Sequence, residues 1–283
     1  MKRIICLLLI IMIFVAGCTS FLKVDEDIVK DVSDKITDTL INTVGQERAE
    51  RQESRAVESA DKDTLNIISS VGNISIERHQ ADDTAIEINI ASKAGSKERA
   101  EEILESYTYI INENESSIDV DTSFKNLLND VNLSVDLVIY IPSNIKEINV
   151  SSNVGDINIS GISGNLRVNS NVGNVMIDKS EASYNIKVDV GNINLKDGTA
   201  TGDSKLNANT GEIDIYFHDI SGSSSITAET GVGNIKMHLS DASGDSGYRA
   251  VINEFMKDER VETKNDQHTS ITLTTRVGEI DFK

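Results

Sequence analysis

The stretch NVGNVMI at residues 171–177 is repeated along the chain with small changes. Six further copies stand at 70–76 (SVGNISI), 153–159 (NVGDINI), 189–195 (DVGNINL), 209–215 (NTGEIDI), 231–237 (GVGNIKM) and 276–282 (RVGEIDF). From the copy at 153–159 to the copy at 231–237, the central glycines are 18, 18, 20 and 22 residues apart. A recurrence at this period predicts a stack of structural repeats. A phosphate-binding loop does not fit, because it needs a helix after its glycines, whereas a strand-like pattern follows here each time.

Apolar and polar residues alternate on both sides of each central glycine, with the period of two that is typical of β-strands. The residues five before, one before, two after and four after the glycine are mostly apolar, and the residue three before it is small. We expect these side chains to face inward, so that two strands meet at a corner where glycine tolerates a positive φ. Serine or threonine at the small position is expected to hydrogen-bond from one repeat to the next. The predicted structural corner glycines are Gly72, Gly155, Gly173, Gly191, Gly211, Gly233 and Gly278.

The pattern predicts an all-β fold, a single-domain β-solenoid or β-helix of short strands stacked about 4.8 Å apart. One or two short helical insertions are expected to interrupt it. Residues 96–107 carry apolar side chains at helical spacing behind Ser96, which is a suitable N-cap. Residues 247–262 also show a helical face, and a strand over YRAVINEF is the alternative there.

The first residues have the features of a secretory signal peptide, which we place at residues 1–17. A basic start precedes an apolar run of 12 residues, at 4–15, which is shorter than the roughly 20 residues that span a bilayer. The sequence VAGC at 15–18 resembles the lipobox of bacterial lipoproteins. This resemblance implies cleavage before Cys18 and a diacylglyceryl group on its sulfur. The protein is therefore expected to be extracytoplasmic, with a lipid anchor in the cell membrane.

Residues 18–63 are predicted to form a lipid-anchored acidic tether that is partly helical. Apolar residues recur at every fourth position from Ile28 to Val44, as in an amphipathic helix. Residues 46–63 are mostly charged, and we interpret them as a solvated spacer. The β-solenoid domain is then expected to occupy residues 64–283.

Composition and motifs argue against several classes of function. The formal net charge is −19, with 27 Lys and Arg against 46 Asp and Glu, which is unsuited to binding nucleic acid. The four histidines are scattered, and we find neither a metal-ligand spacing nor a nucleophile motif. Asn and Asp beside the corners could ligate a hard cation, but we interpret them as ladders that satisfy backbone groups at the turns. We expect no catalytic residues, no metal and no cofactor.

The order of these segments resembles the bacterial putative-adhesin domain family, a β-solenoid domain of unknown function, here carried on a lipoprotein. The resemblance covers residues 64–283, and IPSNIKEINVSSNVGDINI at 141–159 and the repeats after it carry it best. It implies surface exposure and binding. Repeats of short strands converge easily, so the resemblance informs the fold more than the function.

The predicted function is a non-catalytic binding or scaffolding domain at the cell surface or facing the periplasm. Solenoids display extended surfaces, and the partner is expected to be an envelope polysaccharide or protein. An envelope polysaccharide-processing enzyme and a component of an envelope-stress sensor are the alternatives. The sequence leaves the ligand and the oligomeric state open. The possible binding face consists of Asn153, Asn171, Asp189, Asn209 and Asn192.

Overall fold

The computed structural model describes residues 47–124, 132–240, 247–255, 257–265 and 268–283. The chain separates into two units, and the unit Arg48–Lys283 holds nearly all of the described residues. The predicted signal peptide, Cys18 and the amphipathic segment from Ile28 to Val44 lie outside the described residues.

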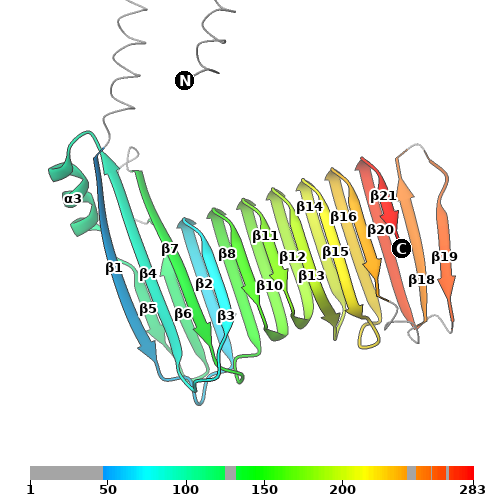
Figure 1. The fold of residues 1–283 in the computed structure, drawn as a ribbon, viewed down its shortest axis with the longest axis horizontal. Helices are drawn as coiled ribbons and strands as arrows, with labels where there is room; N and C mark the ends of the chain where they lie inside the picture. Colours follow the sequence, from blue (N-terminus) through cyan, green and yellow to red (C-terminus); the bar gives the residue numbers. More distant parts are fainter. Residues whose placement is uncertain (1–46, 125–131, 241–246, 256, 266–267) are drawn as a thin grey trace, which may run out of the picture. The chain divides into compact units, whose positions relative to one another are not determined.

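The strands of this unit form two rows, in which neighbouring strands pair through backbone hydrogen bonds (Figure 1). Row 1 contains, in spatial order, β5 (Ile110–Glu113), β6 (Ser117–Thr122), β2 (Thr64–Val71), β8 (Glu147–Val154), β10 (Ser163–Val172), β12 (Glu181–Val190), β14 (Ser204–Thr210), β16 (Ser225–Val232), β20 (Thr269–Val277), β18 (Tyr248–Glu254) and β19 (Arg260–Lys264). Row 2 contains β1 (Glu47–Val57), β4 (Thr84–Ala94), β7 (Asn132–Ile141), β3 (Ile74–Arg78), β9 (Ile157–Ser160), β11 (Val175–Asp178), β13 (Ile193–Ala200), β15 (Ile213–Asp219), β17 (Ile235–Leu239) and β21 (Ile280–Phe282). The chain passes from row 1 to row 2 at each corner glycine.

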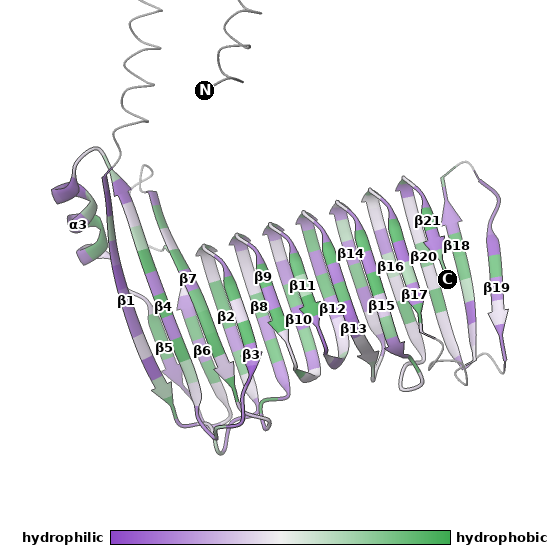
Figure 2. Ribbon diagram, viewed as in Figure 1, coloured by the Kyte–Doolittle hydropathy of each residue, from purple (hydrophilic) through white to green (hydrophobic). Residues whose placement is uncertain are grey.

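The strands of the regular repeats pair in parallel and in register, so that equivalent residues of successive repeats lie side by side. Val168 in β10 aligns with Val150 in β8 and with Ile186 in β12, and Val175 in β11 aligns in the same way with its equivalents in β9 and β13. These side chains are buried between the rows, and hydropathy alternates along the strands (Figure 2). Burial of such apolar ladders drives folding. The predicted β-solenoid fold is confirmed.

The corner glycines have a backbone conformation that other residues rarely adopt. Their φ values lie between +139° and +151°. A Cβ atom on Gly191 would lie 2.1 Å from the carbonyl oxygen of Gly173, and one on Gly173 would lie 2.0 Å from that of Gly155. The corners therefore stack so closely that the backbone of one repeat fills the space that a side chain on the next corner glycine would need.

Most of the valines directly before the glycines face solvent, which corrects the expectation that they point inward. Five of the six have exposed fractions from 44% for Val154 to 60% for Val277, and Val71 is half-buried. The residue before each valine also faces outward, as Asn171 does before Val172, so the inward positions are those three before and two after the glycine. The sequence pattern predicted that the alternation of inward and outward residues continues up to the glycine, but in the structure the alternation stops two residues before it. Val172 aligns with Val154 and Val190 of the neighbouring repeats, while Thr210 takes the equivalent position beside Val190.

The small inward residues three before the glycines behave in two ways. Thr230 and Thr275 donate from Oγ1 to the carbonyl oxygens of Gly211 and Gly233, each at 2.9 Å, and so link successive repeats as predicted. Within the described residues, the buried hydroxyls of three serines have no hydrogen-bond partner, so the predicted ladder is incomplete. These serines are Ser69, Ser152 and Ser170.

At both ends of the stack, the spatial order of the strands differs from their order in the sequence. β2 and β3 lie between the strands β6 and β7 on one side and β8 and β9 on the other. The intervening chain runs outward through β4, the helix α3 (Lys97–Ser106) and β5 before it returns. At the other end, β20 lies between β16 and β18. The pairs β4–β7, β5–β6 and β18–β19 near the two ends are antiparallel.

The structure tests the two predicted helical insertions and the tether. The helix over 96–107 is confirmed as α3, with Ser96 as its N-cap. The helical reading of 247–262 is wrong and its strand alternative is correct, because Ala250 and Ile252 are buried at alternate positions in β18. The spacer reading of 46–63 is also wrong for β1, which pairs with β4. Charged side chains are usual on such end strands, because they oppose pairing with other molecules, and here they hide the strand pattern.

Candidate binding surface

Four of the five residues of the predicted binding face form one ladder on the outer face of row 1. Asn153, Asn171, Asp189 and Asn209 each stand two residues before a corner glycine. The Asn171 side-chain amide donates to Asn153 Oδ1 at 3.1 Å, and that of Asn209 donates to Asp189 Oδ1 at 2.8 Å. Lys187 Nζ lies 3.4 Å from Asp189 Oδ1. We call this set of four residues the corner ladder; hydrogen bonds join its side chains in two pairs, Asn153 with Asn171 and Asp189 with Asn209.

Asn192 has a different place and a different task. It follows Gly191, and its Oδ1 accepts a hydrogen bond of 2.8 Å from the backbone N–H of Glu212 in the next repeat. Its own N–H donates to Asn174 Oδ1 at 3.0 Å, and Asn174 in turn donates from its N–H to Asp156 Oδ1. These contacts confirm the interpretation that polar residues after the corners satisfy backbone groups.

A groove with a volume of about 550 Å³ crosses the outer face of row 1 at the other end of the strands. It runs over five parallel strands, from β8 to β16. Its walls come mainly from the residues six and eight before each corner glycine. We call the first set the groove ladder, and it consists of Asn149, Arg167, Asn185, Lys205 and Thr227. The second set consists of Glu147, Asn165, Ser183, Asp203 and Ser225.

The groove ladder is partly engaged in internal hydrogen bonds. Arg167 Nη1 donates to Asn149 Oδ1 at 3.2 Å, and Asn149 Nδ2 donates to Asn66 Oδ1 at 3.0 Å and to Glu147 Oε1 at 3.2 Å. Within the described residues, the side chains of Asn185 and Lys205 form no hydrogen bond or ion pair. The middle of the groove therefore offers an amide and an ammonium group to a ligand.

The groove and the corner ladder share one face but not one location. The two sets of residues are four positions apart on each strand, which corresponds to about 13 Å at the usual rise of a β-strand. The alternation of apolar and polar residues within each repeat is sufficient to predict that both sets lie on the outer face. Sequence reasoning selected the positions beside the glycines and missed the groove, because the hollow comes from the arrangement of five strands.

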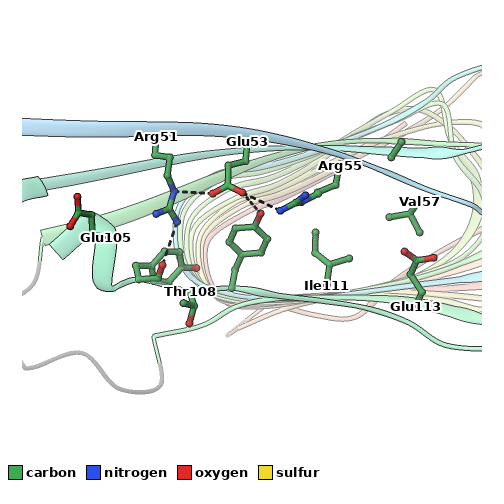
Figure 3. A pocket seen from close by; sticks show the side chains of 11 residues that line it. Arg51, Glu53, Arg55, Val57, Glu105, Thr108, Ile111 and Glu113 are labelled. Atoms are coloured by element: carbon green, nitrogen blue, oxygen red, sulfur yellow. Dashed lines mark hydrogen bonds and ion pairs between the residues drawn. The ribbon is translucent and has the colours of Figure 1, made fainter. Parts of the chain in front are cut away.

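A second cleft, also of about 550 Å³, lies between β1 and the segment that follows α3. Arg51, Glu53 and Arg55 point from β1 into it, toward the strand that holds Ile111 (Figure 3). The Glu53 carboxylate accepts a hydrogen bond of 2.6 Å from the Tyr109 hydroxyl and lies 2.8 Å from Arg51 Nε. Burial, followed by the contact with Glu53, raises the pKa of Tyr109.

Arg51 also explains why this cleft is polar. Its Nη1 and Nη2 donate to the carbonyl oxygens of Leu104 and Tyr107, at 3.0 and 3.3 Å. These carbonyls belong to the last turn and C-cap of α3, whose oxygens lack intrahelical partners. We therefore interpret the polar groups of this cleft as structural, because the Arg51 guanidinium caps the C-terminus of α3 and forms an ion pair with Glu53.

The described residues lack a cluster of potential metal ligands. They contain no group of three or more His, Cys, Asp or Glu side chains that could hold a metal ion. His238 is exposed and stacks on Tyr216 with ring centroids 5.0 Å apart, while Tyr184 is buried. In the same part of the chain, no helix is both long enough and apolar enough to span a bilayer.

Comparison with known proteins gives a family match. The model of the Toastrack DUF4097 family matches residues 36–281. A putative adhesin from Bacteroides fragilis is similar in structure, with 15% sequence identity, a TM-score of 0.47, and coverage of 82% of this chain and 97% of that one. A putative cell adhesion protein from Clostridium sporogenes has 14% identity and a TM-score of 0.37, and covers 83% of this chain and 99% of its own. No curated protein sequence matches the chain.

Proposed function

Because the chain belongs to the Toastrack DUF4097 family, we propose that it is a non-catalytic binding domain, held outside the cytoplasm by a lipid on Cys18. The ligand in this proposal is an envelope polysaccharide, and its place is the groove across row 1. The observation that carries the proposal is the groove itself, which presents equivalent polar side chains from five successive repeats.

The chemistry of the groove suits a chain of hydroxyl groups better than an apolar ligand. Amides such as those of Asn165 and Asn185 offer both donors and acceptors, and Thr227 adds a hydroxyl. A long ligand can contact several repeats in turn, so that affinity is the sum of modest contributions. Large exposed aromatic rings are not part of the lining, and hydrogen bonds must therefore supply most of the specificity.

Binding can be tested by comparing the groove ladder with the corner ladder. Asn185→Ala combined with Lys205→Ala should weaken retention on insoluble envelope polysaccharide about thirtyfold, since each of the two lost hydrogen bonds contributes on the order of 1 kcal/mol. Asn171→Ala combined with Asn209→Ala is the matched control on the same face and should change retention much less.

Two results would contradict the groove as the binding site. One is that the corner-ladder pair weakens retention more than the groove pair, which would return the site to the corner ladder. The other is release of reducing ends from the polysaccharide by the purified protein, which would point to an enzyme.

The lipid anchor rests on the VAGC sequence at residues 15–18. Cells grown with a fatty-acid probe should label the protein, and Cys18→Ala should abolish both the label and the retention of the protein in washed membranes. Equal labelling of the two forms would refute lipidation at this residue. The anchor and the groove are independent parts of the proposal, because the variant leaves the solenoid unchanged.

A further inference from the structure

Arg78 ends β3 at the edge of the stack opposite the corner glycines. Ile74 and Ile76 are buried, so Arg78 takes the next inward position, and its side chain is half-buried. Its Nη1 donates to the carbonyl oxygen of Ser143 at 3.3 Å. Burial lowers the pKa of its guanidinium. This cation therefore extends inward from the end of an apolar ladder.

Two of the three guanidinium nitrogens of Arg78 lack partners. Nε and Nη2 are shielded from solvent and have no hydrogen-bond acceptor among the described residues, and no carboxylate in that part of the chain forms an ion pair with Arg78. Arg51 provides a contrast in charge pairing, since its Nη1 and Nη2 donate to carbonyl oxygens and its Nε, which also lacks a well-aligned hydrogen bond, still lies 2.8 Å from the Glu53 carboxylate. Buried polar groups are almost always paired, so the free edge of Arg78 needs an explanation.

The free edge has a defined chemical preference. Nε and Nη2 form one side of the planar guanidinium, and two parallel N–H groups of this kind bind both oxygens of a carboxylate. A cleft of about 570 Å³ adjoins this side chain. It is lined by Arg78, His79, the exposed residues 80–82 and the turn 142–144.

We propose that this cleft binds the carboxylate of a small acidic ligand, through Nε and Nη2 of Arg78. A carboxylate fits better than a phosphate because Asp82 lines the same cleft, and its negative charge opposes a dianion more strongly than a monoanion. Since both nitrogens are shielded, binding requires a shift of residues that line the cleft. The cleft is separate from the groove, and the proposal does not depend on the groove having a ligand.

The test is a titration followed by nuclear magnetic resonance, with sodium glucuronate as the probe and glucose at the same concentrations as the neutral control. We expect saturable shifts of the Arg78 Nε–H signal and of the backbone amides of 79–83, with a Kd of about 1 mM, as befits a single charged contact. Glucose and sodium chloride of equal ionic strength should give no saturable shift. Inorganic phosphate should bind more weakly than glucuronate.

Variants separate binding from a structural role. Arg78→Lys keeps the charge but loses the two parallel donors, and it should weaken glucuronate binding at least tenfold while leaving the unfolding midpoint nearly unchanged. Arg276→Gln is the matched control, because Arg276 is highly exposed and lies 3.9 Å from Glu229 on row 1, and it should bind like the parent.

Three results would overturn the proposal. The first is the absence of a saturable shift in the parent protein. This result would be decisive even if the variants fail to fold. The second is an equal Kd for Arg78→Lys and the parent. The third is tighter binding of phosphate than of glucuronate, which would show that the cleft selects charge rather than the planar carboxylate.

Discussion

The two long edges of the solenoid differ in how strictly they repeat. At the corner edge, every repeat turns through a glycine of nearly constant φ, and a Cβ atom on these glycines would lie only 1.9–2.1 Å from a backbone oxygen. At the opposite edge, the connections grow along the chain, from two residues after β9 and β11 to three after β13 and five after β15. The increase in glycine spacing from 18 to 22 residues arises at this variable edge.

The difference shows where this fold can change without losing its register. Backbone packing fixes the corner, whereas the variable edge is irregular: φ is positive at Lys179 in the connection after β11, and also at Asp197, where the register of β13 shifts. The groove and the Arg78 cleft both lie toward the variable edge. The corner edge therefore determines how the strands stack, whereas the variable edge can differ between repeats and is where both candidate sites lie.

The strongest test of this contrast is a side chain at a corner glycine. Gly191→Val should lower the free energy of unfolding by about 3–5 kcal/mol, because the new Cβ collides with backbone and the residue is held at positive φ. Gly161→Ala at the variable edge is the matched control and should cost only about 1–2 kcal/mol, because its φ is +65° and the site has room. Urea unfolding of both variants measures the difference. Equal losses would mean that the corner is not the more restrictive edge.

A second test concerns the group that anchors the variable edge from inside. The buried Tyr184 hydroxyl donates to the carbonyl oxygen of Ser180 at 2.6 Å, and the carbonyl oxygen of Thr199 lies 3.3 Å away as a second, weaker acceptor of the same hydrogen. Tyr184→Phe should therefore reduce the free energy of unfolding by about 1–2 kcal/mol at neutral pH. Chemical unfolding at pH 7 measures this loss, and no loss would show that the turn does not need the anchor.

The same residue predicts a pH dependence. Burial raises the pKa of the Tyr184 phenol, so its contribution to stability is complete below the pKa of an unfolded tyrosine, about 10, and is lost as the pH rises above it. The deficit of the Phe variant should then shrink by up to about 1.4 kcal/mol per pH unit above pH 10. A deficit that stays constant from pH 9 to pH 11 would contradict the assignment.

The smallest effect is expected for the valines beside the corner. Val172→Thr should change the free energy of unfolding by less than about 0.5 kcal/mol, because the side chain is exposed and threonine keeps the β-branched shape. If Val172 faced inward, as the alternating pattern predicted, burying a hydroxyl there would cost about 1–3 kcal/mol. Thermal or urea unfolding distinguishes the two values.

Much of the fold could be predicted because sterics and periodicity act within one repeat. The glycine spacing and the alternation of residues such as Ile157 and Ile159 predicted strands, corners and stacking. The exposure of Val172 could not be read in this way, since the corner itself breaks the alternation. β1 was missed because its charged side chains hide a strand pattern. The order of the end strands depends on pairing between distant segments, which no local pattern records.

The candidate site was predicted only in part. The repeat placed Asn171 and Asn209 on an outer face, and the structure puts the groove ladder on that same face. The hollow between Arg167 and Lys205 depends on how five strands lie together, and the free edge of Arg78 depends on which acceptors are missing around it. Both are properties of three-dimensional neighbours rather than of sequence spacing.

The interleaved ends also have a consequence for how the chain folds. In the middle of the stack, contacts join residues 18 apart, as between Asn153 and Asn171, and such local pairing forms early. The contact between Asn66 and Asn149 spans 83 residues, and that between Asn234 and Glu279 spans 45. We therefore expect the central repeats to form first and both ends to close late. During synthesis, β2 cannot complete its pairing until β8 has been made, because β8 is one of its two neighbours in row 1.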